Sequence, residues 1–209
     1  MLLLILACCL IGYLFGSFPA GYFAGRIAGV DVRREGSGNI GATNVLRILG
    51  KKWGYPVFVI DAFKGFAAVR VALILAKRWP AALPYAEYIA ILAAMAAVAG
   101  HTFPIWLRFK GGKGVATSAG ALIGLLPLAV PFVFLVWLIV FQISRYVSLA
   151  SIIAAIALPI IVGLFAFWKF VDTWALIYFS VAIMLLVLWR HRSNFSRLLN
   201  GTEQRFRRK

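Results

Sequence analysis

The chain has 209 residues, 63% of them apolar, and a mean hydropathy of +0.93. These values exclude a water-soluble domain, because apolar runs of about 20 residues, enough to cross roughly 30 Å of hydrocarbon, recur along nearly the whole sequence. The formal net charge of +16 does not indicate nucleic-acid binding, since the basic residues flank the apolar runs, where membrane orientation and anionic lipid headgroups account for them. We therefore expect an all-α integral membrane protein that forms a single membrane domain over residues 1–209.

The apolar segments fall at about 3–28, 55–76, 86–106, 115–144, 147–168 and 173–190. The first lacks a basic start and is longer than the core of a signal peptide, so we expect it to remain in the protein as a helix. Its glycines recur at four-residue spacing, which indicates close packing against another helix. They are Gly12/Gly16 and Gly21/Gly25/Gly29.

A first polar segment, at about 30–54, contains the run Gly36-Ser37-Gly38-Asn39-Ile40-Gly41-Ala42-Thr43-Asn44, followed by Arg47. Glycine permits positive φ and close backbone approach, so successive N–H groups can converge on an anion, while hydroxyl, amide and guanidinium side chains add donors. The glycine spacing matches G-x-G-x-x-G, but no strand precedes it, which argues against a dinucleotide-binding fold. The alternative is a glycine-rich turn whose polar groups satisfy one another.

Two charged side chains, Asp61 and Lys64, lie three residues apart inside the second apolar segment. Ionisable groups within a membrane segment point to function by default, although a neutralised structural pair explains them equally well. The third segment ends with Gly-His-Thr-Phe-Pro, in which His101 is a candidate substrate-binding residue. The alternative for His101 is a satisfied histidine at the membrane interface.

The second polar segment, at about 106–117, contains Phe109-Lys110-Gly111-Gly112-Lys113-Gly114-Val115-Ala116-Thr117. We expect a helix to begin near Val115 and to point its N-terminus back at the two lysines, an arrangement that binds phosphate. The spacing is not that of a Walker A loop. Lysines that only orient a short turn in the membrane are the alternative interpretation.

The 115–144 stretch decides the topology, because it forms either one tilted span or two short helices that fold back near Pro127 and Pro131. Folding back gives seven transmembrane helices, of which the fourth and fifth are short, about 14 residues or 21 Å each. With an external N-terminus, the positive-inside rule then places the C-terminus and all three polar segments in the cytoplasm. A six-span chain loses this charge asymmetry. The basic residues that do not fall on the cytoplasmic side are Lys64, Arg70, Lys77, Arg78 and Lys169.

The third polar segment, at about 190–209, begins as the last apolar segment ends. His191 and Asn194 lie three residues apart and hence on one helical face. Glu203 is the only acid in this tail, and we interpret it as a structural ion-pair anchor among the arginines. Arg145 and Ser148, at the start of the sixth helix, are expected on the same membrane face.

Several catalytic signatures do not occur in the sequence. It contains no His-x4-Asp, no Gly-x-Ser-x-Gly and no evident Ser–His–Asp set. Its six acidic residues do not cluster as metal-binding carboxylates do. We therefore expect no metal, no cofactor and no strong enzyme base.

Five motifs run through essentially the full chain. They are Gly-Ser-Phe-Pro at 16–19, the Gly-Ser-Gly-Asn-Ile-Gly-Ala-Thr-Asn run, Asp-x-x-Lys-Gly at 61–65, Gly-His-x-Phe-Pro leading into Lys-Gly-Gly-Lys-Gly-Val-Ala-Thr, and Asn-x-x-Arg-Leu followed by Gly-Thr-Glu. In this order they closely resemble the bacterial acyl-phosphate:glycerol-3-phosphate acyltransferase family, the PlsY family.

The resemblance implies an enzyme of the bacterial inner (cytoplasmic) membrane whose active site faces the cytoplasm. It would transfer a fatty acyl group from acyl phosphate to the 1-hydroxyl of glycerol 3-phosphate, giving lysophosphatidic acid and inorganic phosphate in phospholipid biosynthesis. Membrane lipids and the soluble enzyme that makes acyl phosphate are the expected partners, and nucleic acid is not.

At the matching positions, the resemblance implies catalytic roles for Ser37, Arg47 and Asn194 and a structural role for Glu203. The substrate-binding candidates are Gly38, Asn39, Gly41, Thr43, Asn44, His101, Lys110, Gly111, Gly112, Lys113, Gly114, Ser148 and His191.

Acyl phosphate is a mixed anhydride with a good leaving group, so we expect no covalent acyl-enzyme. The substrate's own phosphate oxygen is the expected acceptor of the hydroxyl proton. A carrier of phosphorylated anions also needs cationic loops, but the one-sided polar segments and the lack of an inverted repeat argue against it. A non-catalytic lipid-binding scaffold is a third interpretation.

Overall fold

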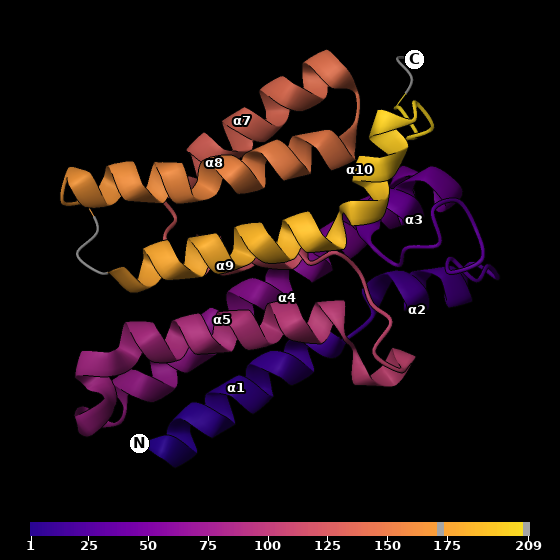
Figure 1. The fold of residues 1–209 in the computed structure, drawn as a ribbon. Coiled ribbons are helices and arrows are strands. Elements are labelled where there is room, and N and C mark those ends of the chain that lie inside the picture. The colour runs from indigo at the N-terminus through magenta and orange to yellow at the C-terminus, as the bar shows by residue number, and fades with distance from the viewer. Residues whose placement is uncertain (171–173, 207–209) are drawn as a thin grey trace. The chain divides into compact units, whose positions relative to one another are not determined.

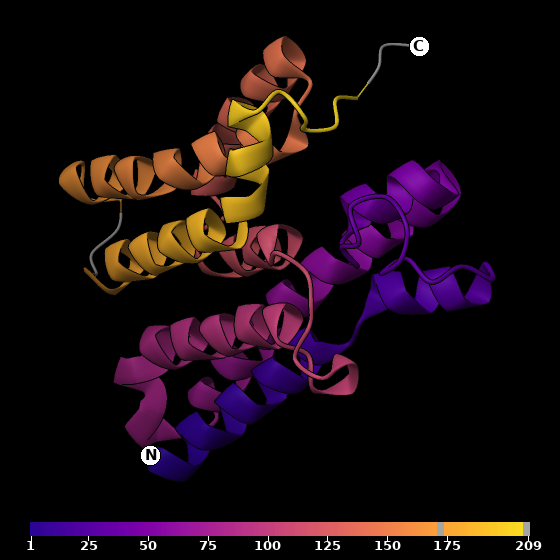
Figure 2. The ribbon, with the colours of Figure 1, turned by 45° about the vertical axis from the view of Figure 1, so that its right-hand side comes forward.

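The structure, a computed structural model, describes residues 1–170 and 174–206, and all regular elements among them are helices. Position 173, the predicted start of the last apolar segment, and Arg207, Arg208 and Lys209 of the basic tail lie outside the described residues. The chain forms two compact units, Met1–Leu125 and Leu126–Lys209, which Figures 1 and 2 show from two directions. The predicted all-α class is confirmed, and the single membrane domain with three cytoplasmic polar segments stays a prediction.

The first unit carries the first two polar segments. Its α5 packs against α1 and α4 (Figure 1). In the same unit, α6 packs against α4. The first apolar segment, expected as one helix, is broken at Phe18 and Pro19, because proline cannot donate the backbone hydrogen bond that would continue the helix. The elements are α1 (Leu2–Ser17), α2 (Ala20–Ile27), α3 (Ala42–Leu49), α4 (Lys51–Lys77), η1 (Pro80–Tyr85), α5 (Ala86–Thr102), η2 (Ile105–Leu107) and α6 (Val115–Leu125).

Glycines bring the long helices of this unit into backbone contact. On α1, a Cβ at Gly16 would overlap the carbonyl oxygen of Ala97 on α5, and Gly12 packs in the same way on Ala93. The predicted helix packing of Gly12 and Gly16 is thereby confirmed. On α6, a Cβ at Gly120 would overlap the carbonyl oxygen of Ala62 on α4. Small residues permit such close approach in membrane helices.

Gly25 and Gly29 do not pack against another helix, so the prediction is wrong for them, whereas a Cβ at Gly21 would also lie 3.1 Å from the side chain of Val45 on α3. Gly21 lies against the carbonyl oxygen of Ile40 and Gly25 against the backbone of Val30, so both admit the loop that follows α2. Gly29 has φ +76° and open space around it, because the chain turns there. Four-residue spacing alone does not identify the packing partner.

The second unit contains the remaining helices. In it α8 packs against both α7 and α9. The predicted break in the 115–144 stretch is confirmed, because α6 ends at Leu125 and α7 begins at Ala129, with Pro127 in the turn between them. The two helices have 11 and 16 residues, against the expected length of about 14. The elements are α7 (Ala129–Ser144), α8 (Val147–Phe167), α9 (Trp174–Arg190) and α10 (Arg192–Leu199).

Length and composition identify the clearest membrane segments. Three described segments are by themselves long and apolar enough to cross a bilayer, and α9 with the bent α10 makes a fourth if counted as one span. Their apolar surface suits a lipid environment. The seven-span topology and the external N-terminus stay predictions. The three segments are Leu2–Ile27, Pro80–Leu107 and Val147–Phe167.

The glycine contacts predict that adding one methyl group lowers the free energy of unfolding at some glycines and not at others. Gly120→Ala places a Cβ on the carbonyl oxygen of Ala62 and should lower the free energy of unfolding by about 1–3 kcal/mol, as overpacking does. Gly163→Ala on α8 is the matched control, because no atom lies within 4 Å of its Cβ position. The control should be neutral or gain up to about 1 kcal/mol of helix propensity. Thermal unfolding in detergent measures both, and equal midpoints would contradict the packing argument.

Candidate substrate site

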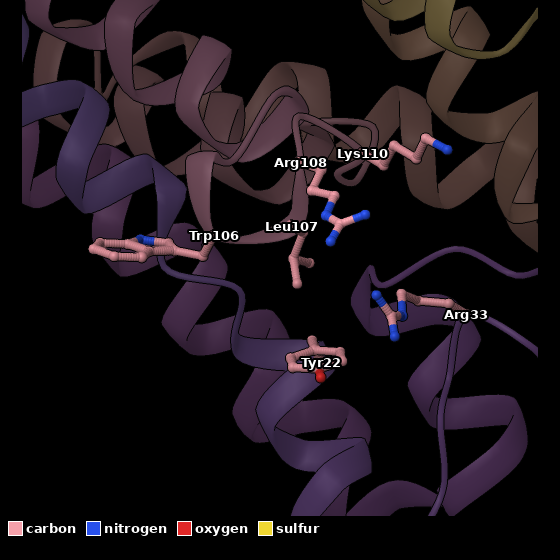
Figure 3. A pocket seen from close by; sticks show the side chains of 6 residues that line it. All are labelled: Tyr22, Arg33, Trp106, Leu107, Arg108 and Lys110. Carbon is pink, nitrogen blue, oxygen red and sulfur yellow. The ribbon is translucent and has the colours of Figure 1, made fainter.

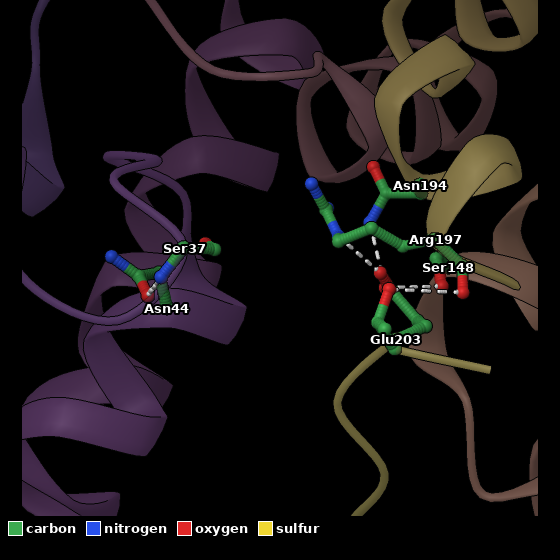
Figure 4. Close-up of polar contacts among 7 residues, drawn as sticks. Ser37, Asn44, Ser148, Asn194, Arg197 and Glu203 are labelled. Atoms are coloured by element: carbon green, nitrogen blue, oxygen red, sulfur yellow. Dashed lines mark hydrogen bonds and ion pairs between the residues drawn. The ribbon is translucent and has the colours of Figure 1, made fainter. Parts of the chain in front are cut away.

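The first polar segment folds around one buried amide, the side chain of Asn44 on α3 (Figure 4). Asn44 is 2% exposed, and its Oδ1 accepts from the amide of Ser37 at 2.9 Å. Its Nδ2 donates to the carbonyl oxygens of Val32 (3.1 Å), Glu35 (3.1 Å) and Asn39 (2.8 Å). These contacts make Asn44 a structural centre of the loop, as the alternative of a self-satisfied turn anticipates, and its contact with substrate stays a prediction.

The folded loop leaves Ser37 exposed between two glycines. Gly36 (φ +59°) and Gly38 (φ +69°) adopt left-handed backbone angles that favour glycine. A Cβ on Gly36 would also lie 2.5 Å from Asn44 Oδ1. Asn44 binds only the backbone amide of Ser37. The exposed Ser37 side chain therefore stays available to a ligand at the loop surface.

The remaining candidates of this segment lie at the start of α3 or along it. Gly41 precedes the helix, and its amide donates to Asn39 Oδ1 at 2.8 Å. Thr43 and Arg47 are half-buried on α3 itself. Arg47 follows Asn44 by three residues and so lies about one helical turn further on.

The second polar segment crosses the end of α5 through its paired glycines. The amide of Gly111 donates to the carbonyl of Thr102, and that of Gly112 to the carbonyl of His101, both at 3.1 Å. A Cβ on Gly112 would overlap the His101 ring at Nε2. The glycines therefore permit close approach to α5. Their role in phosphate binding stays a prediction, as do those of Lys113 and Gly114, after which α6 begins at Val115 as expected.

A strained turn precedes these glycines. Arg108 (φ +52°) and Phe109 (φ +61°) are consecutive non-glycine residues with left-handed backbone angles, each costing roughly 1–3 kcal/mol. Two hydrogen bonds hold the turn, from Phe109 N to the Pro104 carbonyl (3.0 Å) and from Lys110 N to the Leu107 carbonyl (3.1 Å). Such strain concentrates at functional sites, and here it fixes where Arg108 points.

A cationic pocket of about 440 Å³ lies beside this turn (Figure 3). Arg33 and Arg108 point into the same space from two elements, next to the ring of Tyr22, whereas Lys110 points away. Guanidinium groups that share a space repel each other unless an anion binds between them, and a phosphate fits their donor geometry. The lining residues are Tyr22, Arg33, Trp106, Leu107, Arg108 and Lys110.

One carboxylate lies at the edge of the pocket. Arg33 donates from Nε and Nη2 to Asp31 at 2.9 and 2.7 Å, and its Cζ lies 4.7 Å from the centre of the Tyr22 ring. These hydrogen bonds hold the pKa of the Asp31 carboxyl well below its usual range and raise the pKa of Arg33, so both stay charged. Among the described residues, neither Arg108 nor Lys110 pairs with a carboxylate. The pocket is therefore net positive.

The sequence matches one protein family over almost its whole length. The family model for glycerol-3-phosphate acyltransferase matches residues 6–201. The chain belongs to the glycerol-3-phosphate acyltransferase family. A glycerol-3-phosphate acyltransferase of Thermosynechococcus vestitus is 45% identical, over 94% of this chain and 92% of that protein. One of Sinorhizobium fredii is also 45% identical, over 96% and 91%.

The fold of this acyltransferase is similar to two crystal structures of PlsY, an integral membrane glycerol 3-phosphate acyltransferase. The glycerol 3-phosphate form has a TM-score of 0.84 and 41% identity, covering 97% of this chain and 96% of that one. The lysophosphatidic acid form has a TM-score of 0.82 and 39% identity, covering 97% and 95%. This acyltransferase is thus an integral membrane enzyme, which decides against the carrier and the scaffold.

In the second unit of the acyltransferase, Glu203 binds two candidate residues and a neighbouring arginine (Figure 4). Its Oε1 accepts from Ser148 Oγ and Asn194 Nδ2, both at 2.7 Å, and its Oε2 from Arg197 Nε at 2.8 Å. Burial raises the pKa of the Glu203 carboxyl, but the hydrogen bonds and the Arg197 charge lower it more, so the net shift is downward. The ion pair with Arg197 fits the interpretation of Glu203 as an anchor, which stays a prediction, and Glu203 also fixes the side chains of Ser148 and Asn194.

The second histidine of the acyltransferase lies at the end of α9. His191 is 3% exposed, and its Nδ1 lies 2.8 Å from the carbonyl oxygen of Val187. A carbonyl accepts only, so in this arrangement Nδ1 carries the proton. A role for His191 toward substrate stays a prediction.

Sequence reasoning missed the cationic pocket. Arg33 and Arg108 lie outside the glycine-rich motifs, so the sequence indicates for them only a place among the basic residues expected on the cytoplasmic side. Tyr22 lies in a helix that gave no polar signal. The signal for Arg108 was its position just before Lys110, but only the left-handed turn directs its side chain toward Arg33.

The contacts of Asn44 predict a large effect of a small change. Asn44→Asp keeps the size of the side chain but replaces the donor that serves three carbonyls with an acceptor. We expect a loss of at least about 2 kcal/mol of unfolding free energy, given roughly 0.5–1.5 kcal/mol for each lost hydrogen bond. Acyltransferase activity should fall with it, because the loop that carries Ser37 loses three supporting contacts, although an acceptor for the Ser37 amide remains. Unchanged thermal unfolding and activity would contradict a structural role for Asn44.

The lowered pKa of Glu203 predicts an acid-sensitive contribution to stability. A folded-state pKa below the unfolded one adds stability above the unfolded value, about 4.3 for glutamate, and loses it as pH falls through the folded value. Wild type should therefore exceed Glu203→Gln in unfolding temperature at pH 7, and the difference should shrink as the pH drops below about 4. Thermal unfolding of both proteins from pH 7 to 3 measures this. A difference that is independent of pH would count against the ion pair.

Proposed function

We propose that this acyltransferase transfers a fatty acyl group from acyl phosphate to the 1-hydroxyl of glycerol 3-phosphate. The products are 1-acyl-glycerol 3-phosphate, which is lysophosphatidic acid, and inorganic phosphate, for phospholipid biosynthesis. The observation that carries the proposal is the cationic pocket of Arg33, Arg108 and Lys110 in the unit that also holds the exposed Ser37. The PlsY structures in glycerol 3-phosphate and lysophosphatidic acid forms support the substrate and the product.

The reaction exchanges one acyl–oxygen bond for another. The 1-hydroxyl oxygen of glycerol 3-phosphate attacks the acyl carbon, and the bond from that carbon to the phosphate oxygen breaks. Phosphate leaves readily from the mixed anhydride, so no acyl-enzyme is needed. The hydroxyl proton passes to a phosphate oxygen of the substrate. The protein holds the hydroxyl about 3 Å from the acyl carbon and stabilises the phosphate charges.

The contacts of the two histidines support this substrate-assisted route. His101 is buried behind Gly112 and faces Asp61. His191 is buried and binds the Val187 carbonyl through Nδ1. Ser37, Arg47 and Asn194 are the proposed catalytic residues, which orient substrate and bind phosphate charge. The carboxylate of Glu203 binds the Asn194 amide, which fixes its direction.

We place this activity at the cytoplasmic face of the bacterial inner membrane. The proposed chain crosses the bilayer seven times, through α1–α2, α4, η1–α5, α6, α7, α8 and α9, with an external N-terminus. The distribution of basic residues supports this topology through the positive-inside rule. A cytoplasmic site is open to glycerol 3-phosphate and to the soluble enzyme that makes acyl phosphate.

Purified protein incubated with acyl phosphate and radiolabelled glycerol 3-phosphate tests the proposal directly. A lipid-extractable, labelled product together with released inorganic phosphate is expected. Acyl carrier protein or coenzyme A thioesters in place of acyl phosphate should give none. Product formed only from a thioester would overturn the proposed donor.

The pocket predicts a graded effect of removing one cation. Arg108→Ala should raise KM for a phosphorylated substrate about 10- to 100-fold, the worth of a charge-assisted hydrogen bond. Arg78→Ala is the matched control, because Arg78 is an exposed cation just after the end of α4 and should leave KM unchanged. Initial rates with each substrate varied in turn identify which phosphate the pocket binds. Equal KM values for the two variants would exclude the pocket from the site.

A further inference from the structure

A buried cluster of charged and polar groups lies beneath the second polar segment. Asp61, Lys64 and His101 are 2%, 5% and 5% exposed. Asp61 Oδ1 lies 2.8 Å from Lys64 Nζ and 3.5 Å from His101 Nδ1. The cluster therefore joins α4 to the last turn of α5. The proposed chemistry uses none of these three residues.

Each end of the cluster leads to one polar segment. Lys64 Nζ donates to the Phe18 carbonyl at 3.0 Å, at the break between α1 and α2 from which the chain runs into the first polar segment. His101 lies behind the second, since its carbonyl accepts from Gly112 N at 3.1 Å and its ring fills the space that a Cβ on Gly112 would need. One carboxylate thus connects the supports of both segments.

Stability alone does not explain three buried polar side chains in so apolar a chain. The free energy needed to remove two charges from water is about as large as the free energy gained from their attraction. Apolar residues of similar volume therefore often replace such pairs without lowering stability. Charge-assisted hydrogen bonds do supply direction, because they hold their atoms at set distances and angles. Direction matters where two loops must bind substrate in one fixed geometry.

We propose that Asp61, Lys64 and His101 are positioning residues for the acyltransferase reaction. Asp61 fixes the His101 ring, the ring and its carbonyl seat the backbone of Gly112, and Lys64 fixes the α1–α2 break through the Phe18 carbonyl. His101 then acts on the second polar segment and does not touch substrate. This inference rests on the proposed function, because it is tested by KM for glycerol 3-phosphate as a substrate.

Three substitutions at His101 separate positioning from direct contact. His101→Leu removes both ring nitrogens, His101→Asn places an amide nitrogen near the position of Nδ1, and His101→Gln places one near Nε2. We expect Leu to raise KM for glycerol 3-phosphate about 10- to 100-fold, as loss of a supporting contact behind a binding residue does. Asn should restore most of the loss and Gln should not, because Asp61 faces Nδ1. Rescue by Gln alone would show that Nε2 meets substrate and would overturn the proposal.

A second pair of variants tests the contact between the ring and the glycine. Gly112→Ala should lower kcat/KM about 100-fold, as a displacement near 1 Å does. In the His101→Asn background the shorter side chain leaves room for the methyl group, so the same change should cost far less. Equal costs in the two backgrounds would mean that Gly112 is not seated on His101, and would overturn the proposal even if His101→Leu fails to fold.

Ile89→Ala on α5 is the control for stability. Ile89 is 1% exposed and lies three turns before His101, so the cavity should lower the unfolding temperature without changing KM. Wild type that makes no lysophosphatidic acid would refute the proposed function. An active wild type whose His101 variants lose stability but keep KM, and keep the affinity for glycerol 3-phosphate measured by calorimetry, would refute only the positioning role.

Discussion

The structure depends on how a largely apolar chain satisfies its few buried carboxylates. A carboxylate removed from water is stable only where other protein groups bind its oxygens. In the first unit Asp61 has Lys64 and His101 as partners. In the second, Glu203 accepts from Ser148, Asn194 and Arg197. Each carboxylate thereby connects segments distant in sequence, and each cluster includes residues of a polar motif.

The glycines of the motifs serve the fold as much as the ligand. Gly36 makes room for the Asn44 amide and Gly112 for the His101 ring, so in both loops a missing Cβ lets a buried side chain support the backbone. This arrangement leaves the exposed groups, Ser37 in the first segment and Lys110 in the second, on rigid supports. A loop that binds a phosphorylated substrate gains from such support, because ordering it on binding would cost conformational entropy.

The site could be predicted from the sequence only in part. The glycine-rich motifs predict Ser37, Arg47 and the two lysines as site residues, because their residue types and order are local properties, and of these Lys110 lines the cationic pocket. The alternative of a self-satisfied turn anticipates the internal role of Asn44 but not its partners, which lie 5 to 12 residues away. The seat of Gly112 on His101 was missed, since it arises from a contact between a loop and the end of α5. Arg33 and Arg108 were missed because a left-handed turn, which no local propensity favours for arginine or phenylalanine, sets the direction of Arg108.

The sequence by itself determined the helical class, the apolar segments, the break near Pro127, the start of α6 at Val115 and the family. These follow from hydrophobic periodicity, proline's missing donor and motif order, which need no knowledge of distant contacts. Only the tertiary structure decided which side chains the motifs use internally and which they leave exposed. It also revealed that His101 is buried against Asp61 and Gly112, and that Arg33 and Arg108 share a pocket. The physical reason is that hydrogen bonds and close contacts depend on distances between helices, and sequence spacing does not contain those distances.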